Sequence, residues 1–450
     1  MGMQLETIPT SLINLVQKLR DKLHDNQFVA RHRMRPQDFT RDRQLTFPTV
    51  MIFVLQKTVK SIQRHLNELM NTLCEDGLFE PVTAGAWTHA RAKLKHTAFI
   101  ELNAEVVLPA VHQQNDQLKR WHGHRLFGHD SSLLRVPDSV ELAQRFGRVE
   151  IKNNRGPTGT AYPEARMSVL YDLLNRIAIN ARLESSREGE VSVAIEQSVY
   201  LQPGDVVLND RGFTGYRYLA EHIRRDVHVI GRCSTGSFAA AQELFRMDRA
   251  NRSHVVKLFA PADQRAELKA LGLPLELTVR FISLRLPDGK LEVLVTTLLD
   301  EQKYPTEEFL DVYHCRWNHE TFYKVLKSRL ELENFSGETV EAVRQDFHAS
   351  VLLCNLETLL THPAETAIEQ TSSEDHQPKQ INRADSFHAL KDQLLQLLYS
   401  DTPPEMVIRK LQQMFLVRPI SVPRDRKVPR RKQSFHRAYH FQRHVKKAVY

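Results

Sequence analysis

The first part of the chain carries apolar side chains at three- and four-residue spacing, with almost no strict alternation. This spacing predicts helices within residues 5–23, 46–74 and 84–107. We therefore expect a helical N-terminal DNA-binding domain over residues 1–118. Its last predicted helix follows a Thr cap and displays Arg91 and Lys93 among small residues, a composition that suits a helix entering a DNA groove. A bundle that only packs on itself explains the pattern nearly as well.

From about residue 123 the pattern changes to that of strands. Apolar segments with turn residues between them predict strands at residues 125–130, 133–136, 167–174, 176–183, 206–209, 227–231, 275–286 and 291–298. The last two are joined by Pro287-Asp288-Gly289-Lys290, which is a strong hairpin signal. Helical spacing returns at residues 313–327, 338–361 and 386–417.

These patterns predict an α/β fold in a multidomain α+β chain. We expect a catalytic domain over residues 119–362, with a β-rich insertion at about 233–303, and a polar linker at 363–385. Residues 386–450 are expected to form a helical C-terminal region that ends in a basic tail. From Arg418 onward there are eleven Lys or Arg residues and one acid, Asp425, so the tail holds the whole basic excess of a chain whose net charge is +8. Such a tail indicates contact with a phosphate backbone or, alternatively, a solubilising extension.

The predicted helix at residues 313–327 carries an unusual set of polar side chains. At about 100° per residue, Tyr313, Arg316, Glu320 and Lys327 fall within an arc of roughly 60°, and Lys324 lies beside them. The simplest interpretation is a solvated helix in which Arg316 and Glu320, four residues apart, form a surface salt bridge. Two acids elsewhere in the chain favour a different interpretation.

Asp130 and Asp210 each stand at the end of a predicted buried strand, where open α/β sheets place their chemistry. If these two carboxylates meet Glu320, three hard oxygen ligands can hold two divalent cations about 3.5–4 Å apart, an arrangement that suits in-line attack on a phosphodiester. Mg²⁺ is the natural ion. Arg316, Lys327 and Tyr313 would then hold phosphate oxygens, with Lys324 as a further phosphate contact and Arg211, which follows Asp210, as a further DNA contact.

Composition narrows the class of protein. With 41% hydrophobic residues, the 450-residue chain can bury a large core, and no apolar run approaches the length of a bilayer span. The four cysteines are scattered without metal-ligand spacing, which suits a reducing compartment.

Three motifs resemble those of a known family. They are Asp130-Ser131-Ser132 with Val136-Pro137-Asp138 after it, Asn209-Asp210-Arg211-Gly212-Phe213, and a Tyr-x2-Arg-x3-Glu-x6-Lys signature at positions 313, 316, 320 and 327. In this order they resemble the transposases of bacterial insertion sequences in the IS-four family, where the last signature is often called YREK. The resemblance covers most of residues 30–350.

The resemblance implies a ribonuclease-H-like catalytic core interrupted by a β-rich insertion. It implies Mg²⁺-dependent cleavage at transposon ends and strand transfer into target DNA, with Mn²⁺ able to substitute. Asp130, Asp210 and Glu320 would be the metal-binding catalytic triad. The partners would be terminal inverted repeats, target DNA and a second copy of the chain when two ends are synapsed, in the bacterial cytoplasm at the nucleoid.

Some features leave alternatives open. Certain relatives stack a flipped base on a Trp from the insertion, whereas the tryptophans here are Trp87, Trp121 and Trp317. Hairpin chemistry would therefore need a substitute, and Phe238, Phe245 and Phe281 are candidates, although each also suits a place in the core. Two other functions remain: a hydrolytic nuclease of the same fold, and an inactive, transposase-derived DNA-binding protein.

Overall fold

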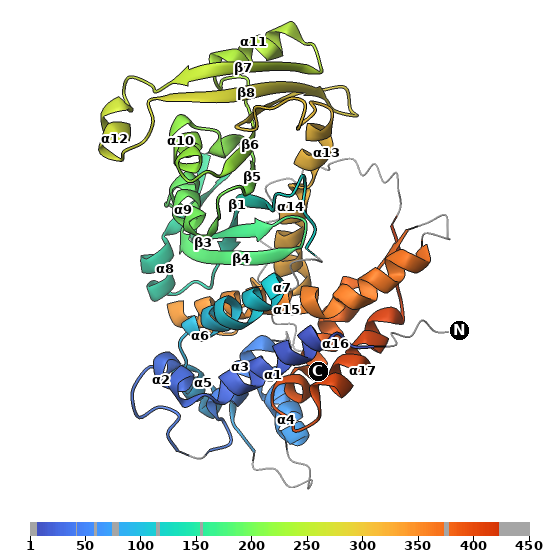
Figure 1. Ribbon diagram of the computed structural model, residues 1–450. Helices are drawn as coiled ribbons and strands as arrows, with labels where there is room; N and C mark the ends of the chain where they lie inside the picture. Colours follow the sequence, from blue (N-terminus) through green and yellow to red (C-terminus); the bar gives the residue numbers. More distant parts are fainter. Residues whose placement is uncertain are drawn as a thin grey trace. The chain divides into compact units, whose positions relative to one another are not determined.

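The computed structural model describes residues 7–41, 43–57, 61–73, 81–113, 118–153, 156–372 and 378–422. The chain divides into two compact units (Figure 1). The first contains Met1–Asp116, Arg135–Glu164 and Lys324–Tyr450, and the second contains Gln117–Leu134 and Ala165–Tyr323. Most of the predicted basic tail lies outside the described residues.

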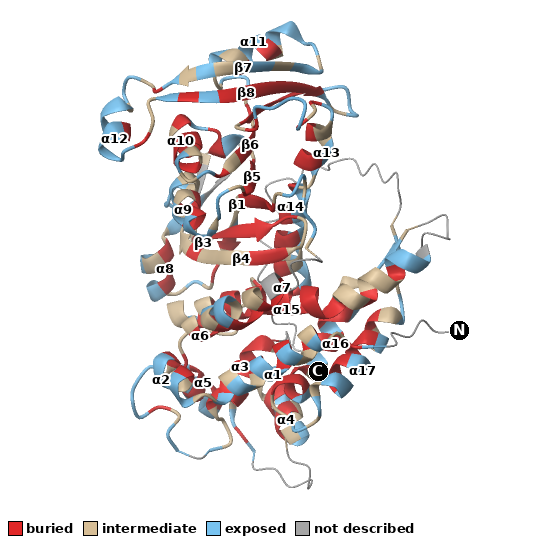
Figure 2. Cartoon of the chain, viewed as in Figure 1, coloured by how far each residue is buried: buried red, intermediate tan, exposed pale blue. Residues whose placement is uncertain are grey.

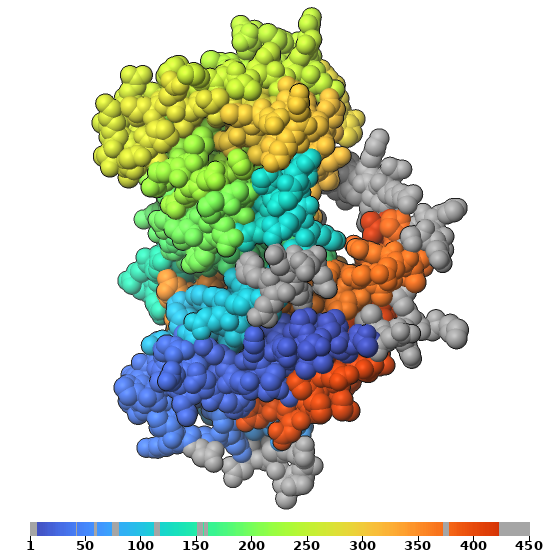
Figure 3. All heavy atoms as spheres, viewed as in Figure 1, coloured from blue at the N-terminus to red at the C-terminus, as the bar shows by residue number. Residues whose placement is uncertain are grey.

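The first unit is mainly helical, and its long helix is α15, Val340–Ser372. Against α15 pack α3, α6, α16 and α17, so helices from both ends of the chain share one core. Figure 3 shows α1 and α17, which are distant in sequence, side by side on the surface. The helices are α1 (Thr10–His24), α2 (Asn26–His32), α3 (Phe47–Leu55), α4 (Ile62–Leu73), α5 (Ala84–Arg91), α6 (Thr97–Leu102), the π-helix η1 (Asn103–Val107), α7 (Leu108–Gln113), α8 (Val140–Phe146), the π-helix η5 (Val325–Arg329), α16 (Arg383–Leu398) and α17 (Pro404–Leu416).

The fully buried helix α3 shows how local sequence produces this core. Thr46 caps its N-terminus by accepting the Thr49 N–H, and Pro48 occupies the first turn, where a missing N–H costs nothing. All nine of its residues are buried, as expected for a helix that is apolar on every side.

The second unit is built on a mixed sheet in which the strands follow the order β4-β3-β1-β5-β6-β9-β8-β7. Strands β1, β5 and β6 run parallel, whereas β4 pairs antiparallel with β3, and β9, β8 and β7 continue the sheet antiparallel. The bounds are β1 (Leu126–Arg135), β3 (Gly156–Asp172), β4 (Ile177–Ser185), β5 (Val206–Asn209), β6 (His228–Arg232), β7 (Arg252–Phe259), β8 (Glu276–Arg285) and β9 (Leu291–Thr296). The predicted strands are therefore present, and 125–130 and 133–136 form the single strand β1.

Residues of β5 are buried along its whole length, which explains its continuous apolar run (Figure 2). The helical segments of this unit are α9 (Glu190–Gln197), the 3-10 turns η3 (Ser198–Tyr200) and η4 (Arg211–Phe213), α10 (Tyr216–Arg224), α11 (Ala239–Met247), α12 (Arg265–Ala270), α13 (Glu308–His314) and α14 (Trp317–Lys324). In the first unit, β2 (Arg148–Asn153) pairs with the beginning of β3, and β10 (Lys379–Gln380) pairs with β11 (Ile420–Ser421).

Two sequence-based expectations need correction. The single helix expected at residues 313–327 is wrong: α13 ends at His314, α14 begins at Trp317, and η5 follows. The break arises because the N–H groups of Cys315 and Arg316 bond to carbonyls three residues earlier, which tightens the chain. The polar segment expected as a linker at 363–385 begins inside α15, whose exposed face supplies the polar residues.

The compact units also cut the chain differently from the expected domains, because α15 draws its core from both ends of the sequence. None of the helices in the described ranges is long and apolar enough to cross a membrane.

Candidate functional site

Asp130 and Asp210 occupy equivalent positions on neighbouring parallel strands. The register pairs Gly128 of β1 with Leu208 of β5. Two residues further along, Asp130 lies within β1 and Asp210 directly follows the end of β5, so the expectation that Asp130 ends its strand is wrong. Side chains two residues apart share a face of a sheet, and adjacent strands lie about 4.8 Å apart. The register therefore brings both carboxylates to one edge of the sheet.

Glu320 reaches the same region from α14 through Arg316. The Arg316 guanidinium donates to Glu320 Oε1 at 3.2 Å and lies over the rings of Tyr313 and Trp317, at 5.8 and 5.6 Å. Only 6% of Arg316 is exposed, so its pair with Glu320 is not the solvated surface bridge of the simplest interpretation.

The charge of Arg316 is shared by all three acids. Burial opposes the charged form of this guanidinium, yet its pKa is raised, because Tyr313, Asp210, Glu320 and Asp130 together favour the cation. Residues that are distant in sequence thus act on a single cationic group. The structure brings together five of the predicted site residues: Asp130, Asp210, Tyr313, Arg316 and Glu320.

Burial disfavours the ionised form of the Asp130 carboxyl. Burial raises the pKa of its carboxyl to about 6, and the Glu320 and Glu190 carboxylates add to this rise, while the Ser131 N–H and Arg316 oppose it. The Ser131 N–H donates to Asp130 Oδ1 at 2.9 Å. A bound cation would relieve this repulsion between carboxylates.

Two tyrosines fasten α13 and α14 to the acid-bearing strands. The Tyr313 hydroxyl donates to the carbonyl of Asn209, at the end of β5, at 3.2 Å. The Tyr323 hydroxyl donates to the carbonyl of Asp130 at 2.6 Å. Burial raises the pKa of both phenols, so they remain protonated donors. Sequence reasoning missed Tyr323, although it lies in the same motif region, because its partner is distant in sequence.

Arg232 and Glu292 are further neighbours that sequence reasoning missed. Because Asn209 pairs with Gly231, Arg232 falls beside Asp210 on the next strand, and its Nη1 lies 3.9 Å from Asp210 Oδ1. Its Nε lies 3.3 Å from the buried Glu292. Burial raises the pKa of Glu292, and Asp210 adds to the rise. The sequence feature that could have indicated Arg232 is its place at the end of an apolar strand.

The carboxylate oxygens of the acids at this edge are the kind of atom that a divalent cation such as Mg²⁺ takes as a ligand. In the part of the chain that the structure describes, no group of three or more His, Cys, Asp or Glu side chains is arranged to hold a metal ion. Glu320 is instead paired with Arg316, which supplies the positive charge at this edge. The donors themselves, hard carboxylate oxygens on adjacent strands, fit a hard ion such as Mg²⁺.

The remaining predicted phosphate contacts belong to the first unit. Lys324 is exposed. Lys327 lies in η5, and burial lowers its pKa, although Glu333 and Glu164 favour its charged form. Arg211, in the second unit, is exposed directly after Asp210.

Arg91, predicted as a possible DNA contact, is not displayed on the surface as expected: it is 5% exposed, and its guanidinium is bonded inside the first unit. It donates to Gln345 at 2.7 Å, to Asp346 at 2.8 Å, and to Ser336 and the Ala342 carbonyl. Its partners lie about 250 positions away, so no local pattern could have shown this role.

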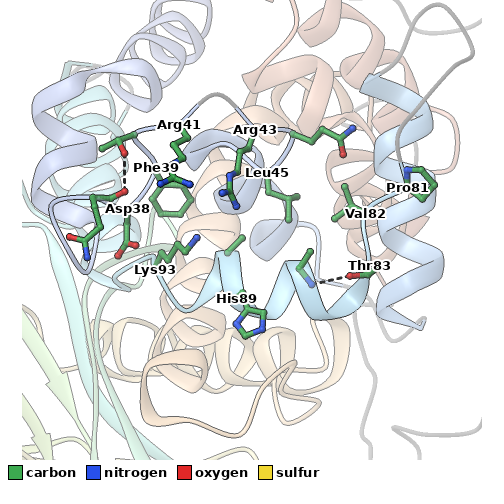
Figure 4. A pocket seen from close by; sticks show the side chains of 15 residues that line it. Asp38, Phe39, Arg41, Arg43, Leu45, Pro81, Val82, Thr83, His89 and Lys93 are labelled. Atoms are coloured by element: carbon green, nitrogen blue, oxygen red, sulfur yellow. Dashed lines mark hydrogen bonds between the residues drawn. The ribbon is translucent and has the colours of Figure 1, made fainter.

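Lys93 lines an open cavity of about 1190 Å³ in the first unit (Figure 4). Residues 37–41 and 43–45 form one wall, and residues between 81 and 93 form the other. Arg41 and Arg43 are exposed, and Figure 4 shows Arg41 and Lys93 gathered near the Phe39 ring. Among the described residues of the lining, Asp38 is the one acid, so the cavity is basic.

The flipped-base substitutes proposed from the sequence lie in the core. Phe281 is fully buried, and Phe238 packs edge-on against it, with ring centroids 5.7 Å apart. Phe281 belongs to the apolar cluster of the second unit, and Phe238 and Phe245 are partly buried against that cluster.

Comparison with known proteins gives a family match over about half of the chain. Residues 121–356 match the family model described as the transposase DDE domain. The chain is 26% identical over 243 residues to the transposase InsG of insertion sequence element IS4 from Escherichia coli K12; the aligned part covers 52% of this chain and 52% of InsG, so the match spans about half the length of that relative. A solved piggyBac transposase synaptic complex with hairpin DNA aligns with a TM-score of 0.44 and 10% identity, covering 92% of this chain and 86% of that chain.

Proposed function

Because the chain belongs to the IS4-type DDE transposases, we propose that it is a DNA transposase that cleaves transposon ends and transfers the cut strands into target DNA. The observation that carries the proposal is that one buried cation, Arg316, pairs with Glu320 while Asp130 and Asp210 also favour its charged form. DDE transposase domains generally use divalent metal ions, and we propose Mg²⁺ here, with Mn²⁺ as a substitute.

We further propose that the core is ribonuclease-H-like. The strand order β4-β3-β1-β5-β6, with the last three parallel, supports this assignment, and the antiparallel strands β9, β8 and β7 would belong mainly to the insertion. We propose that the expected domains differ in function, although the compact units have other bounds. These domains are a DNA-binding domain (1–118), a catalytic domain (119–362) and a C-terminal region (386–450).

In this proposal Asp130, Asp210 and Glu320 hold the cations. When bound, the ions would activate the attacking oxygen and neutralise charge at the scissile phosphodiester. Tyr313 and Tyr323 keep the acid-bearing segments of β5 and β1 fixed relative to α13 and α14, since each hydroxyl donates to a strand carbonyl.

Arg316 would bind the phosphate next to the scissile bond. Its charge lies where Asp130, Asp210 and Glu320 act on it, and its Nε has no hydrogen-bond partner among the described residues. Its planar fork suits two-point contact with phosphate better than a lysine does. Lys327, Lys324 and Arg211 would add charge along the DNA, and two copies of the chain would hold two ends together.

The basic cavity of the first unit supports a role in DNA binding. Arg41, Arg43 and Lys93 place three cations around one opening, and phosphate contacts of this kind supply most of the affinity for DNA. We propose that the transposon end contacts this wall.

The test uses supercoiled DNA that carries the terminal inverted repeats of the element, incubated with the full chain and Mg²⁺. We expect cuts at the repeat ends and joined products. Asp130→Ala, Asp210→Ala and Glu320→Ala should each lower cleavage by at least about a thousandfold, and Arg316→Ala by about a hundredfold.

Asp263→Ala, which changes an exposed acid of the second unit, is the matched control and should cleave normally. Cuts without joining would instead identify a hydrolytic nuclease. Binding without any cut would identify an inactive DNA-binding protein. Either result overturns the proposed function.

A further inference from the structure

Ser131, Arg166 and Glu190 form a closed hydrogen-bonded group next to Asp130, within the second unit. The Ser131 hydroxyl donates to Glu190 Oε1 at 2.6 Å and accepts from Arg166 Nη1 at 2.8 Å. Arg166 also forms an ion pair with the same Glu190 oxygen. Since the Ser131 N–H donates to Asp130 Oδ1, the group ends on the first acid of the site.

The other oxygen of Glu190 faces the second acid-bearing segment. A Cβ built on Gly212 would lie 3.8 Å from Glu190 Oε2, and Gly212 stands two residues after Asp210. Helix α9, which begins at Glu190, packs against residues 211–213. One carboxylate therefore lies between the residue that follows Asp130 and the turn that follows Asp210.

Glu190 is held firmly although it is not deeply buried. Its side chain is 40% exposed, and that of Arg166 is 15% exposed. Arg166 is fixed in turn by donating to the Ser186 carbonyl at 3.2 Å. The anchor for Glu190 thus comes from β3 and the turn after β4, elements that carry none of the three proposed metal ligands.

We propose that Glu190 is a positioning residue, which sets the separation of the Asp130 and Asp210 carboxylates and thereby the affinity of the site for its divalent cation. The inference rests on the proposed function, because it concerns the proposed cofactor. In this role Glu190 acts through Ser131 and through the segment at Gly212. Partners that orient metal ligands typically change metal affinity by about 10- to 100-fold when they are removed.

The test compares Glu190→Ala and Glu190→Gln in the full chain. Glutamine keeps an oxygen acceptor for Ser131 and Arg166 but removes the charge, whereas alanine removes both. We expect Glu190→Ala to raise the Mg²⁺ concentration for half-maximal cleavage about tenfold or more, with little change at saturating Mg²⁺. Glu190→Gln should stay within about threefold of the unsubstituted protein, since it retains the orienting bonds.

Mn²⁺ binding to the DNA-free protein can be followed by electron paramagnetic resonance, which does not depend on activity. The metal affinities of the variants should fall in the same order as in the cleavage assay. Glu188→Ala is the matched control, since Glu188 is an exposed acid two residues earlier. Ser131→Ala, which removes only the hydroxyl, should reproduce part of the shift even if Glu190→Ala folds poorly in a thermal melt.

The outcomes separate the two proposals. A chain that neither cleaves DNA with Mg²⁺ nor binds Mn²⁺ overturns the proposed function. Normal cleavage with an unchanged metal requirement in Glu190→Ala overturns the positioning role alone. Equal shifts in Glu190→Ala and Glu190→Gln also overturn it, since the charge and not the hydrogen-bonded position would then matter.

Discussion

The buried carboxyl groups Asp130 and Asp172 differ in which neighbouring groups oppose the effect of burial on their pKa. Asp130 shares the Arg316 charge with two other acids and keeps a raised pKa. Asp172, at the turn between β3 and β4, accepts hydrogen bonds from the Leu174 and Asn175 N–H groups and from the Asn175 side chain. Burial raises its pKa to about 6 despite these bonds. Hydrogen bonds from neutral groups therefore do not offset its desolvation.

Asp172 gives a prediction for stability against pH. Its folded pKa lies above the unfolded value of 3.8, so its contribution to stability is fully present below pH 3.8 and is lost as the pH rises through about 6. Asp172→Asn cannot ionise and escapes this loss. Relative to the unsubstituted protein, the variant should gain about 3 kcal/mol in free energy of unfolding between about pH 3.5 and pH 8. Urea unfolding at both pH values measures this difference, and a constant difference would contradict it.

At the scale of elements, α13 and α14 depend on hydroxyl groups for their attachment to the sheet. Tyr313 and Tyr323 donate to backbone carbonyls of two neighbouring strands, beside the proposed metal ligands. The contact with β1 is also close, since a Cβ on Gly128 would come within 2.9 Å of the buried His319 ring. Small residues and phenols together set how near α14 lies to Asp130.

Tyr323→Phe should therefore affect both stability and chemistry. The Asp130 carbonyl loses its donor, which should lower the free energy of unfolding by about 1–2 kcal/mol. Cleavage should fall about tenfold, because the strand segment that carries Asp130 is less fixed. Thermal unfolding and the plasmid assay measure the two effects. Tyr200→Phe, at an exposed position, is the control, and equal effects in both variants would rule out the strand attachment.

The sequence predicted these elements unevenly, for physical reasons. The apolar runs before Asp130 and Asp210 identified the strands that carry them, because burial on both faces leaves a continuous signal. The break at Cys315 and Arg316 carries no Gly or Pro, so helical periodicity extended across it. Glu190 and Arg232 escaped notice, because each acquires its meaning only from partners brought in by the tertiary fold.

At the scale of the whole molecule, the chain passes repeatedly between two units. Three segments build the first unit and two build the second. Composition could not reveal this, since α15 resembles the end of a catalytic domain in sequence yet packs with helices from residues 47–102 and 383–416. The same interleaving explains why the sequence indicated a DNA contact for Arg91. Its buried partner Asp346 belongs to α15, which is distant in sequence, so the local pattern showed only an unpaired cation.

The first unit therefore contains two kinds of cation close together in sequence, and they should respond oppositely to substitution. Joint replacement of Arg41, Arg43 and Lys93 by alanine should weaken DNA binding with little change in stability, and the slope of log affinity against log salt should fall by roughly 0.9 for each DNA phosphate that is no longer neutralised.

Arg91→Ala should instead leave Asp346 buried without its main partner and lower the free energy of unfolding by about 3–5 kcal/mol. Arg64→Ala, an exposed arginine on α4, controls for a general loss of charge. Fluorescence anisotropy across a salt series and urea unfolding measure the two effects, and an unchanged salt slope in the triple variant would exclude the cavity as a DNA-binding surface.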